Sequence, residues 1–183
     1  IVSDKPLAMN GDEAQQLLDA ATKAGVVHAV TFNYRGNPLV QQARAMIANG
    51  EIGRVHFIHG HYLQDWLIKE TDFSWRIEPE KSGPTSAMGD IGSHWCDLVQ
   101  HVSGLRIESV LADLTTVIPT RKKPTVARET FSEATDDEGE DFTVTVEDLG
   151  SVLVRFGNGC KGLFTAGQVC AGHKNDLVFE ING

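Results

Sequence analysis

The feature that most constrains this chain is a helix expected over residues 84–102, which carries two different stripes of side chains. Positions three, four or seven residues apart lie on one face of a helix. One stripe is apolar and suits a buried core, and it consists of Ile91, Trp95, Leu98 and Val102. The adjacent stripe is polar and consists of Asp90, His94, Asp97 and His101. The fold must therefore bury one face of this helix while carboxylates and imidazoles gather beside the core, an arrangement typical of a functional site.

The pattern around this helix predicts an α+β fold in two unequal parts. Residues 1–3, 11–24 and 26–32 match a strand, a helix and a buried strand, a unit of the kind that builds nucleotide-binding domains. A helix is expected over 38–49, and a half-buried strand over 54–62 has His59 and His61 on one face. Further strands are expected at 107–118, 142–147, 150–156, 160–169 and 176–181, with a loop at 133–141. Such a succession favours a predominantly antiparallel open sheet backed by helices.

Composition excludes several classes of function. The net charge of −9 argues against a nucleic-acid-binding surface, and the only basic cluster, residues 121–123, is expected to be a solvated loop. No apolar run approaches the roughly 18 residues that span a bilayer, so no membrane partner is expected. Three cysteines without CxxC spacing fit a reducing compartment, which favours the cytoplasm. The chain starts without Met, so an export signal on a longer parent stays open.

Several short motifs follow one another in a recognisable order. They are Asp4-Lys5-Pro6, Asn33-Tyr34-Arg35, the segment 49–55, Trp75-Arg76, Ser82-Gly83 and Asp90-x-x-x-His94-x-x-Asp97. This ordered set resembles the Gfo/Idh/MocA family of NAD(P)-dependent oxidoreductases and extends over essentially the whole chain. Two departures are visible. Asp4 replaces the usual glutamate, and Pro84 stands where a second glycine is common.

The resemblance implies a division into two domains. Residues 1–35 would be the C-terminal part of a Rossmann domain that binds NAD or NADP. Residues 36–183 would form a substrate-binding and oligomerisation domain with the dihydrodipicolinate reductase-like C-terminal fold, cut short at its end. No Gly-x-Gly-x-x-Gly precedes Lys5, and that loop normally holds the pyrophosphate. A longer protein that contains this chain is expected to carry the loop upstream of Lys5. The chain by itself is expected to bind NAD weakly or not at all.

The resemblance also implies the activity and its catalytic residues. Family members transfer a hydride between NAD(P) and a secondary alcohol of a sugar, cyclitol or anhydrosugar, and associate as homo-oligomers through the open sheet. Lys5, Asp90 and His94 would be catalytic. An imidazole exchanges protons near neutral pH, so His94 suits the base that takes the hydroxyl proton. Lys5 would ease deprotonation, and Asp90 would bind a neighbouring hydroxyl.

Other positions are expected to contact the ligands. Lys5 and Pro6 would border the cofactor. The substrate-binding candidates are Tyr34, Gln64, Trp66, Arg76 and Asp97. Gln64-Asp65-Trp66 resembles a strand-end motif of the levoglucosan dehydrogenase-like members, in which glutamine and tryptophan contact the sugar. Asp97 is equally compatible with a role in stabilising the helix, and Trp75 is expected to be a core aromatic.

Two interpretations from other classes stay open. Asp90, His94 and Asp97 could ligate Zn²⁺ or Mn²⁺ in a hydrolase, because carboxylates and imidazoles at helical spacing suit such ions. The sequence offers no second ligand cluster and no HExxH motif for this alternative. The chain could also be a non-catalytic domain that assembles subunits.

Overall fold

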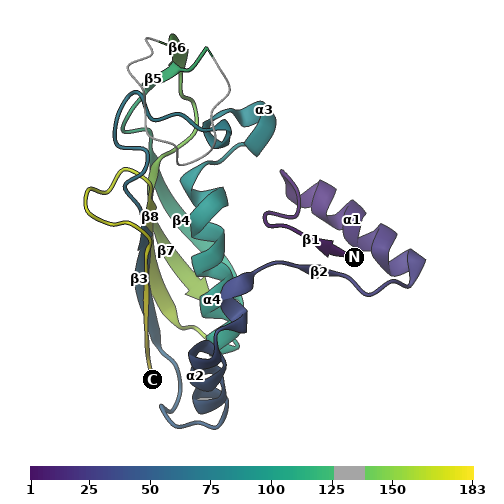
Figure 1. Ribbon diagram of the computed structural model, residues 1–183. Coiled ribbons are helices and arrows are strands. Elements are labelled where there is room, and N and C mark those ends of the chain that lie inside the picture. The colour runs from purple at the N-terminus through teal and green to yellow at the C-terminus, as the bar shows by residue number, and fades with distance from the viewer. Residues whose placement is uncertain (126–138) are drawn as a thin grey trace.

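The computed structural model describes residues 1–125 and 139–183, and its centre is a five-stranded sheet (Figure 1). The strands lie in the order β4-β7-β8-β3-β9. Their bounds are Phe57–Leu63 for β3, Ile107–Thr115 for β4, Leu149–Phe156 for β7, Lys161–Gly167 for β8 and Asp176–Asn182 for β9. Only the β3–β8 pair is parallel in this sheet; its other three pairs are antiparallel. The predicted α+β fold with a predominantly antiparallel sheet is confirmed.

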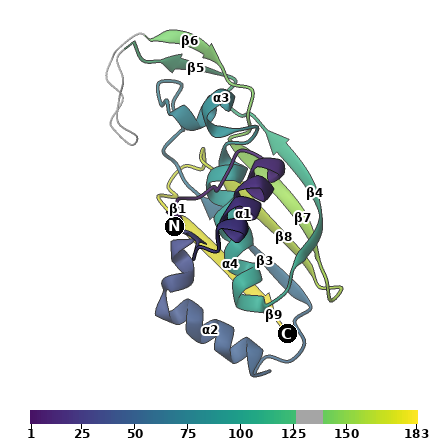
Figure 2. The ribbon, with the colours of Figure 1, turned by 90° about the vertical axis from the view of Figure 1, so that its right-hand side faces the viewer.

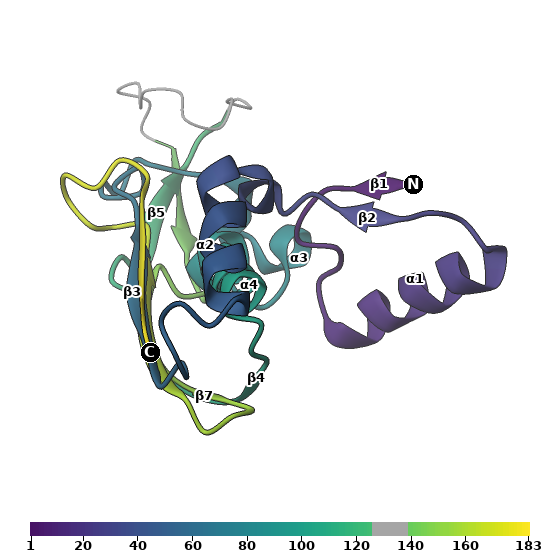
Figure 3. The same ribbon diagram turned by 90° about the horizontal axis from the view of Figure 1, so that it is seen from below.

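One face of the sheet is covered by α4 (Ser93–Ser103), with α2 (Pro38–Ala48) beside it (Figures 1 and 3). The apolar stripe of the central helix is buried as predicted: Ile91, Trp95, Leu98 and Val102 are at most 3% exposed. The Trp95 ring stacks on Phe164 with 4.4 Å between centroids. It also lies over Gly60, where an added Cβ would come within 2.9 Å of the indole nitrogen. Gly60 in β3 therefore leaves room for the Trp95 ring, which packs the helix against the sheet.

The start of this helix differs from the prediction. Residues 79–82 form a separate short helix, α3 (Pro79–Ser82), and the main helix begins with a π turn over Met88–Gly92. The distant Glu147 carboxylate accepts hydrogen bonds from the backbone amides of Ser86 and Met88 at 2.9 and 2.8 Å. Because a residue far away in the sequence caps the first turn, local periodicity could not locate this boundary.

The N-terminal unit projects from the helical side of the sheet (Figures 1 and 3). It consists of β1 (Val2–Ser3), α1 (Gly11–Ala24) and β2 (Ala29–Val30), and its two strands are parallel. The expected strand over 26–32 is shorter than predicted, and Val27 is 90% exposed. The reason is that β2 pairs only with the equally short β1 among the described residues. The 3-10 helix η1 (Asn33–Gly36) leads from this unit into α2.

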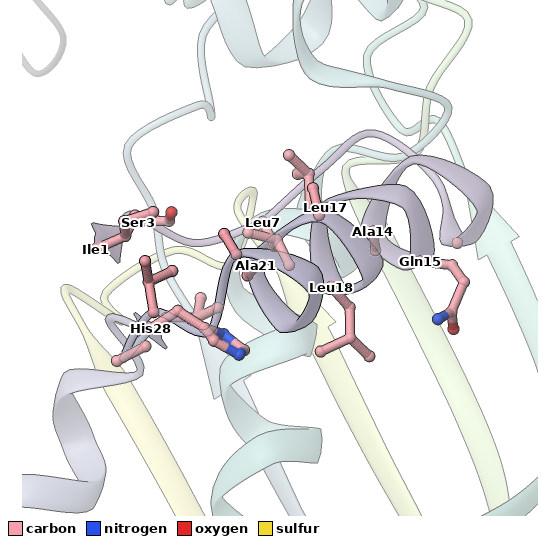
Figure 4. A pocket seen from close by; sticks show the side chains of 15 residues that line it. Ile1, Ser3, Leu7, Ala14, Gln15, Leu17, Leu18, Ala21 and His28 are labelled. Atoms are coloured by element: carbon pink, nitrogen blue, oxygen red, sulfur yellow. The ribbon is translucent and has the colours of Figure 1, made fainter.

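The N-terminal unit leaves apolar side chains uncovered. A hollow between α1 and the two strands is lined mostly by small and apolar side chains, among them Leu7, Leu17 and Leu18, together with Gln15 and His28 (Figure 4). Leu17 and Leu18 are 48% and 45% exposed. Exposed apolar patches mark sites of interaction with proteins, membranes or ligands.

A two-stranded ribbon of β5 (Thr120–Lys123) and β6 (Glu140–Thr143) stands at one end of the sheet (Figure 2). The strand expected over 142–147 is thus shifted toward the N-terminus. Most of the loop expected over 133–141 lies outside the described residues, and its last two positions belong to β6.

The expectation that residues 121–123 form a solvated loop is wrong. Arg121 is 1% exposed, and its guanidinium donates to the carbonyls of the segment 67–72 and to the buried Asp148. These acceptors lie 27 to 54 positions away in the chain, so no local pattern indicates them. Within the ranges 1–125 and 139–183, no helix is long and apolar enough to cross a membrane.

Candidate active site

The site lies where the N-terminal unit meets the π turn of the central helix. Lys5 follows β1, and its Nζ donates to the Asp90 carboxylate at 2.8 Å and to the Asp90 main-chain carbonyl at 2.6 Å. The two residues are 85 positions apart in the sequence. Their side chains are 15% and 17% exposed, so the ion pair is largely shielded from water. The structure thus brings together two of the three residues expected to be catalytic.

The second oxygen of the Asp90 carboxylate is also bound. It lies 3.2 Å from Nε of Arg76 and accepts a hydrogen bond of 2.9 Å from Nε2 of Gln168. Gln168 is fully buried just after β8. With donors on both oxygens, this carboxylate is held in one orientation. Gln168 was missed by the sequence analysis, and no motif marks it.

His94, the third expected catalytic residue, lies on α4 beside this ion pair. Its ring contacts Phe32, Tyr34 and Tyr62, with centroid distances of 5.7, 4.9 and 6.3 Å. Burial, and then the positive charge of Lys5, lower the pKa of His94 below its ordinary value. Among the described residues, none forms a hydrogen bond with either ring nitrogen. The lowered pKa favours the neutral imidazole, which can accept a proton.

A chain of hydrogen bonds joins three of the expected substrate-binding residues. The hydroxyls of Tyr34 and Tyr62 lie 2.7 Å apart, and Tyr62 donates to Asn175 Oδ1 at 2.7 Å. Gln64 donates to the same oxygen at 2.8 Å and accepts from the Trp66 indole at 2.8 Å. Burial, followed by the Tyr34 hydroxyl, raises the pKa of Tyr62, so its hydroxyl stays protonated. Tyr62 and Asn175 were missed, although Tyr62 shares a strand face with Gln64 and could have been found.

Arg76 connects this chain to Asp90. Its guanidinium carbon lies 5.9 Å from the centre of the Trp66 ring and 4.7 Å from the centre of the Trp75 ring. Ser74 caps the short 3-10 helix η2 (Trp75–Ile77) that presents Arg76. The expectation that Trp75 is a core aromatic is wrong: it is 44% exposed, because it covers the arginine rather than entering the core.

Asp97 stands apart from these residues. The guanidinium of Arg35 binds its carboxylate through both Nε, at 2.8 Å, and a terminal nitrogen. His101, one turn later, contacts Gln41 and Arg44. Along the polar stripe of the helix, successive residues therefore contact successive segments of the N-terminal part of the chain. Its end is occupied by contacts that fasten η1 and α2 to α4, while its start carries the site.

The charges disfavour the alternative metal site on this helix. Both carboxylates that it would use are bound by cations, Asp90 by Lys5 and Arg76 and Asp97 by Arg35. A divalent ion would have to displace these partners. Pro6, expected to border a cofactor, lines a cleft between the N-terminal unit and α3 together with Lys5, Arg76 and Asp90.

The mixed α+β fold, with its mostly antiparallel sheet covered by helices on one face, is shared with solved structures of oxidoreductases. The profile of the GFO/IDH/MocA C-terminal domain matches residues 40–183. The chain belongs to the GFO/IDH/MocA family, and the resemblance drawn from its motifs is confirmed.

Individual relatives agree with this assignment. The chain is 35% identical to levoglucosan dehydrogenase of Pseudarthrobacter phenanthrenivorans, over 100% of this chain and 47% of that protein. A structure of levoglucosan dehydrogenase with NADH and L-sorbose is similar with a TM-score of 0.88 and 36% identity, covering 100% of this chain and 46% of that one. An inositol dehydrogenase homologue with NAD⁺ from Azotobacter vinelandii has a TM-score of 0.81 and 26% identity, covering 100% and 43%. The chain thus spans about half the length of the relatives it matches.

Proposed function

We propose that this chain is part of a dehydrogenase that transfers a hydride between NAD or NADP and a secondary alcohol of a sugar, cyclitol or anhydrosugar. The observation that carries the proposal is the Lys5–Asp90 ion pair, formed across 85 residues beside the imidazole of His94. The names of the relatives, which are sugar dehydrogenases and an inositol dehydrogenase homologue, support it. Residues 1–35 would belong to the cofactor domain and residues 36–183 to the substrate domain.

The residues present fit the nicotinamide end of such a cofactor. Lys5 and Pro6 line a cleft beside Asp90, as expected for residues between cofactor and substrate. The sequence has no glycine-rich loop for the pyrophosphate. We propose that a further part of the nucleotide-binding domain supplies it and covers the apolar hollow of α1 (Figure 4). When bound, the cofactor supplies the hydride acceptor.

The chemistry assigned to the chain's own residues is acid–base catalysis. The neutral His94 imidazole accepts the proton of the substrate hydroxyl, and its lowered pKa keeps it unprotonated beforehand. The ammonium group of Lys5 stabilises the negative charge that develops on that oxygen. Asp90 holds Lys5 in place and accepts a hydrogen bond from a neighbouring hydroxyl. Gln64, Trp66, Arg76 and the tyrosines offer further polar groups and aromatic faces of the kind that sugars bind.

An activity assay tests the proposal. The full-length enzyme is incubated with NAD⁺ or NADP⁺ and a panel of polyols that includes levoglucosan, glucose and myo-inositol, and cofactor reduction is followed by absorbance. We expect at least one polyol to be oxidised with one of the two cofactors. A folded enzyme that reduces neither cofactor with any member of the panel would refute the proposed reaction.

We also propose that the outer face of the sheet joins copies of the chain. Leu111, Leu153 and Leu163 are cross-strand neighbours and are 71%, 51% and 42% exposed. The described helices α2 and α4 lie on the opposite face of the sheet (Figure 1). Sedimentation equilibrium is expected to show a dimer or larger oligomer that Leu153→Glu dissociates, whereas a monomeric wild-type protein would count against this interface.

We further propose a cytoplasmic location for the protein. All three cysteines are free of disulfides, which supports a reducing compartment.

A further inference from the structure

A second group of chemically active side chains lies away from the candidate active site. It consists of His61 on β3, His173 in the segment between β8 and β9, and Asp176 at the start of β9. The Asp176 Oδ2 atom lies 3.0 Å from Nε2 of His61 and 2.7 Å from Nδ1 of His173. The three donor atoms all lie within 4.8 Å of one another. The proposed dehydrogenase reaction uses none of them.

The fold brings these three side chains together from separate segments. Alternation along β3 turns Tyr62 toward the helical face and His61 toward the outer face of the sheet. Asp176 opens β9 opposite Leu63, and so lies diagonally across from His61. The segment that carries His173 is fastened by Asp65, whose carboxylate accepts from the Lys174 ammonium at 2.9 Å and from the Gly172 amide at 3.2 Å. The two imidazoles and the carboxylate are thus positioned before any ligand arrives.

The donor set suits a transition metal. Two imidazole nitrogens and one carboxylate oxygen are a known ligand combination for Zn²⁺, with a fourth position left for water. In a tetrahedral zinc site with bonds of about 2.0–2.1 Å, the ligand atoms stand about 3.3 Å apart. The contacts through Asp176 are close to this spacing, so small side-chain shifts would admit the ion.

We propose that His61, His173 and Asp176 form a binding site for a divalent transition metal, with Zn²⁺ as the favoured ion. Such an ion would clamp the segment 168–175 to β3. The same segment carries Asn175, which binds Tyr62 and Gln64 on the other side of the sheet edge. The metal would therefore stabilise the position of a candidate substrate-binding residue without touching the substrate.

Calorimetric titration of the chelator-treated 183-residue chain with ZnCl₂ tests the site. We expect one Zn²⁺ to bind per chain, and His173→Ala and His61→Ala to weaken binding by at least about tenfold. His56→Ala, at an exposed histidine just before β3, is the matched control and should leave the affinity unchanged. The proposal fails if Zn²⁺ does not bind saturably, or if the three variants bind it alike.

Two further measurements guard against an unfolded variant. Asp176→Asn keeps the size of the side chain and an acceptor for one histidine, and it should lose the metal while its circular dichroism stays that of the wild type. Co²⁺ bound to the wild-type chain should give the visible absorption of a tetrahedral site, and this absorption should disappear in Asp176→Asn. A folded Asp176→Asn variant that keeps the Co²⁺ spectrum would overturn the assignment.

Discussion

Replacing Arg121 by methionine is expected to lower the free energy of unfolding by about 3–5 kcal/mol, as is typical when one partner of a buried ion pair is removed. Arg121 and Asp148 are 1% exposed, and the guanidinium also satisfies the carbonyls of Leu67, Lys69 and Asp72 at 2.7–3.1 Å. Methionine fills much of the volume but donates no hydrogen bond. The variant would leave the buried Asp148 carboxylate without its cation, and one buried and two partly buried carbonyls without this donor.

Urea denaturation of the 183-residue chain measures this effect, and Lys122→Met is the matched control. Lys122 is the next residue of β5, and its ammonium pairs with Asp141 at 2.5 Å on the surface. Exposed ion pairs contribute about 0–1 kcal/mol, so the control should unfold close to the wild-type midpoint. Equal losses in the two variants would show that the buried arginine is not a principal support of the fold.

Replacing His94 by alanine in the full-length enzyme is expected to lower kcat about 10²–10⁴-fold, the usual contribution of a positioned general base. The imidazole lies beside the Lys5–Asp90 pair, and among the described residues around that pair it is the only one that can act as a neutral base. His101→Ala is the control, because this histidine lies on the same helix face but contacts Gln41 and Arg44 instead. Similar losses in both variants, or full activity in His94→Ala, would contradict the assignment.

The pH profile gives the same residue a second readout. Only the neutral imidazole accepts a proton, so activity should fall as the pH drops through the pKa of His94, which burial and Lys5 place below 6.5. Removing the positive charge with Lys5→Met should raise that pKa and shift the acid limb of the remaining activity to higher pH. An acid limb that does not move would mean that another group titrates.

Local patterns predicted the parts of the fold that depend on neighbours in sequence. The apolar stripe of Ile91 and Trp95 follows from helical periodicity alone, and both residues are buried as expected. The π turn and the burial of Arg121 were not predictable in this way. Each depends on an acidic residue from a different segment: Glu147 lies 61 positions from Ser86, and Asp148 lies 27 positions from Arg121. A sequence pattern carries no record of such long-range partners.

The residues of the candidate site divide in the same way, into those that local patterns predicted and those that only long-range contacts bring together. The spacing of Asp90 and His94 predicted that they share a helix face, and motif order pointed to Lys5. Asn175 and Gln168 come from segments that follow β8 and carry no motif, so only the folded sheet brings them to the site. Asp97 matched the motif equally well, but the structure engages its carboxylate with Arg35.

The double contact of Lys5 with Asp90, through both the carboxylate and the main-chain carbonyl, would make the proposed catalysis depend on where the N-terminal unit lies. The chain passes from the N-terminal unit into the rest of the molecule through η1 (Figure 3). Besides Lys5, the Phe32 ring contacts His94, and Met9 lies against Gly83. A hinge rotation that carried the unit outward would pull the ammonium group from its partner and dismantle the proton-handling group. In the proposed mechanism, a molecule in this open arrangement would lack the Lys5–Asp90 pair and would not catalyse the reaction. Closure over the substrate would re-form the pair and so restore activity.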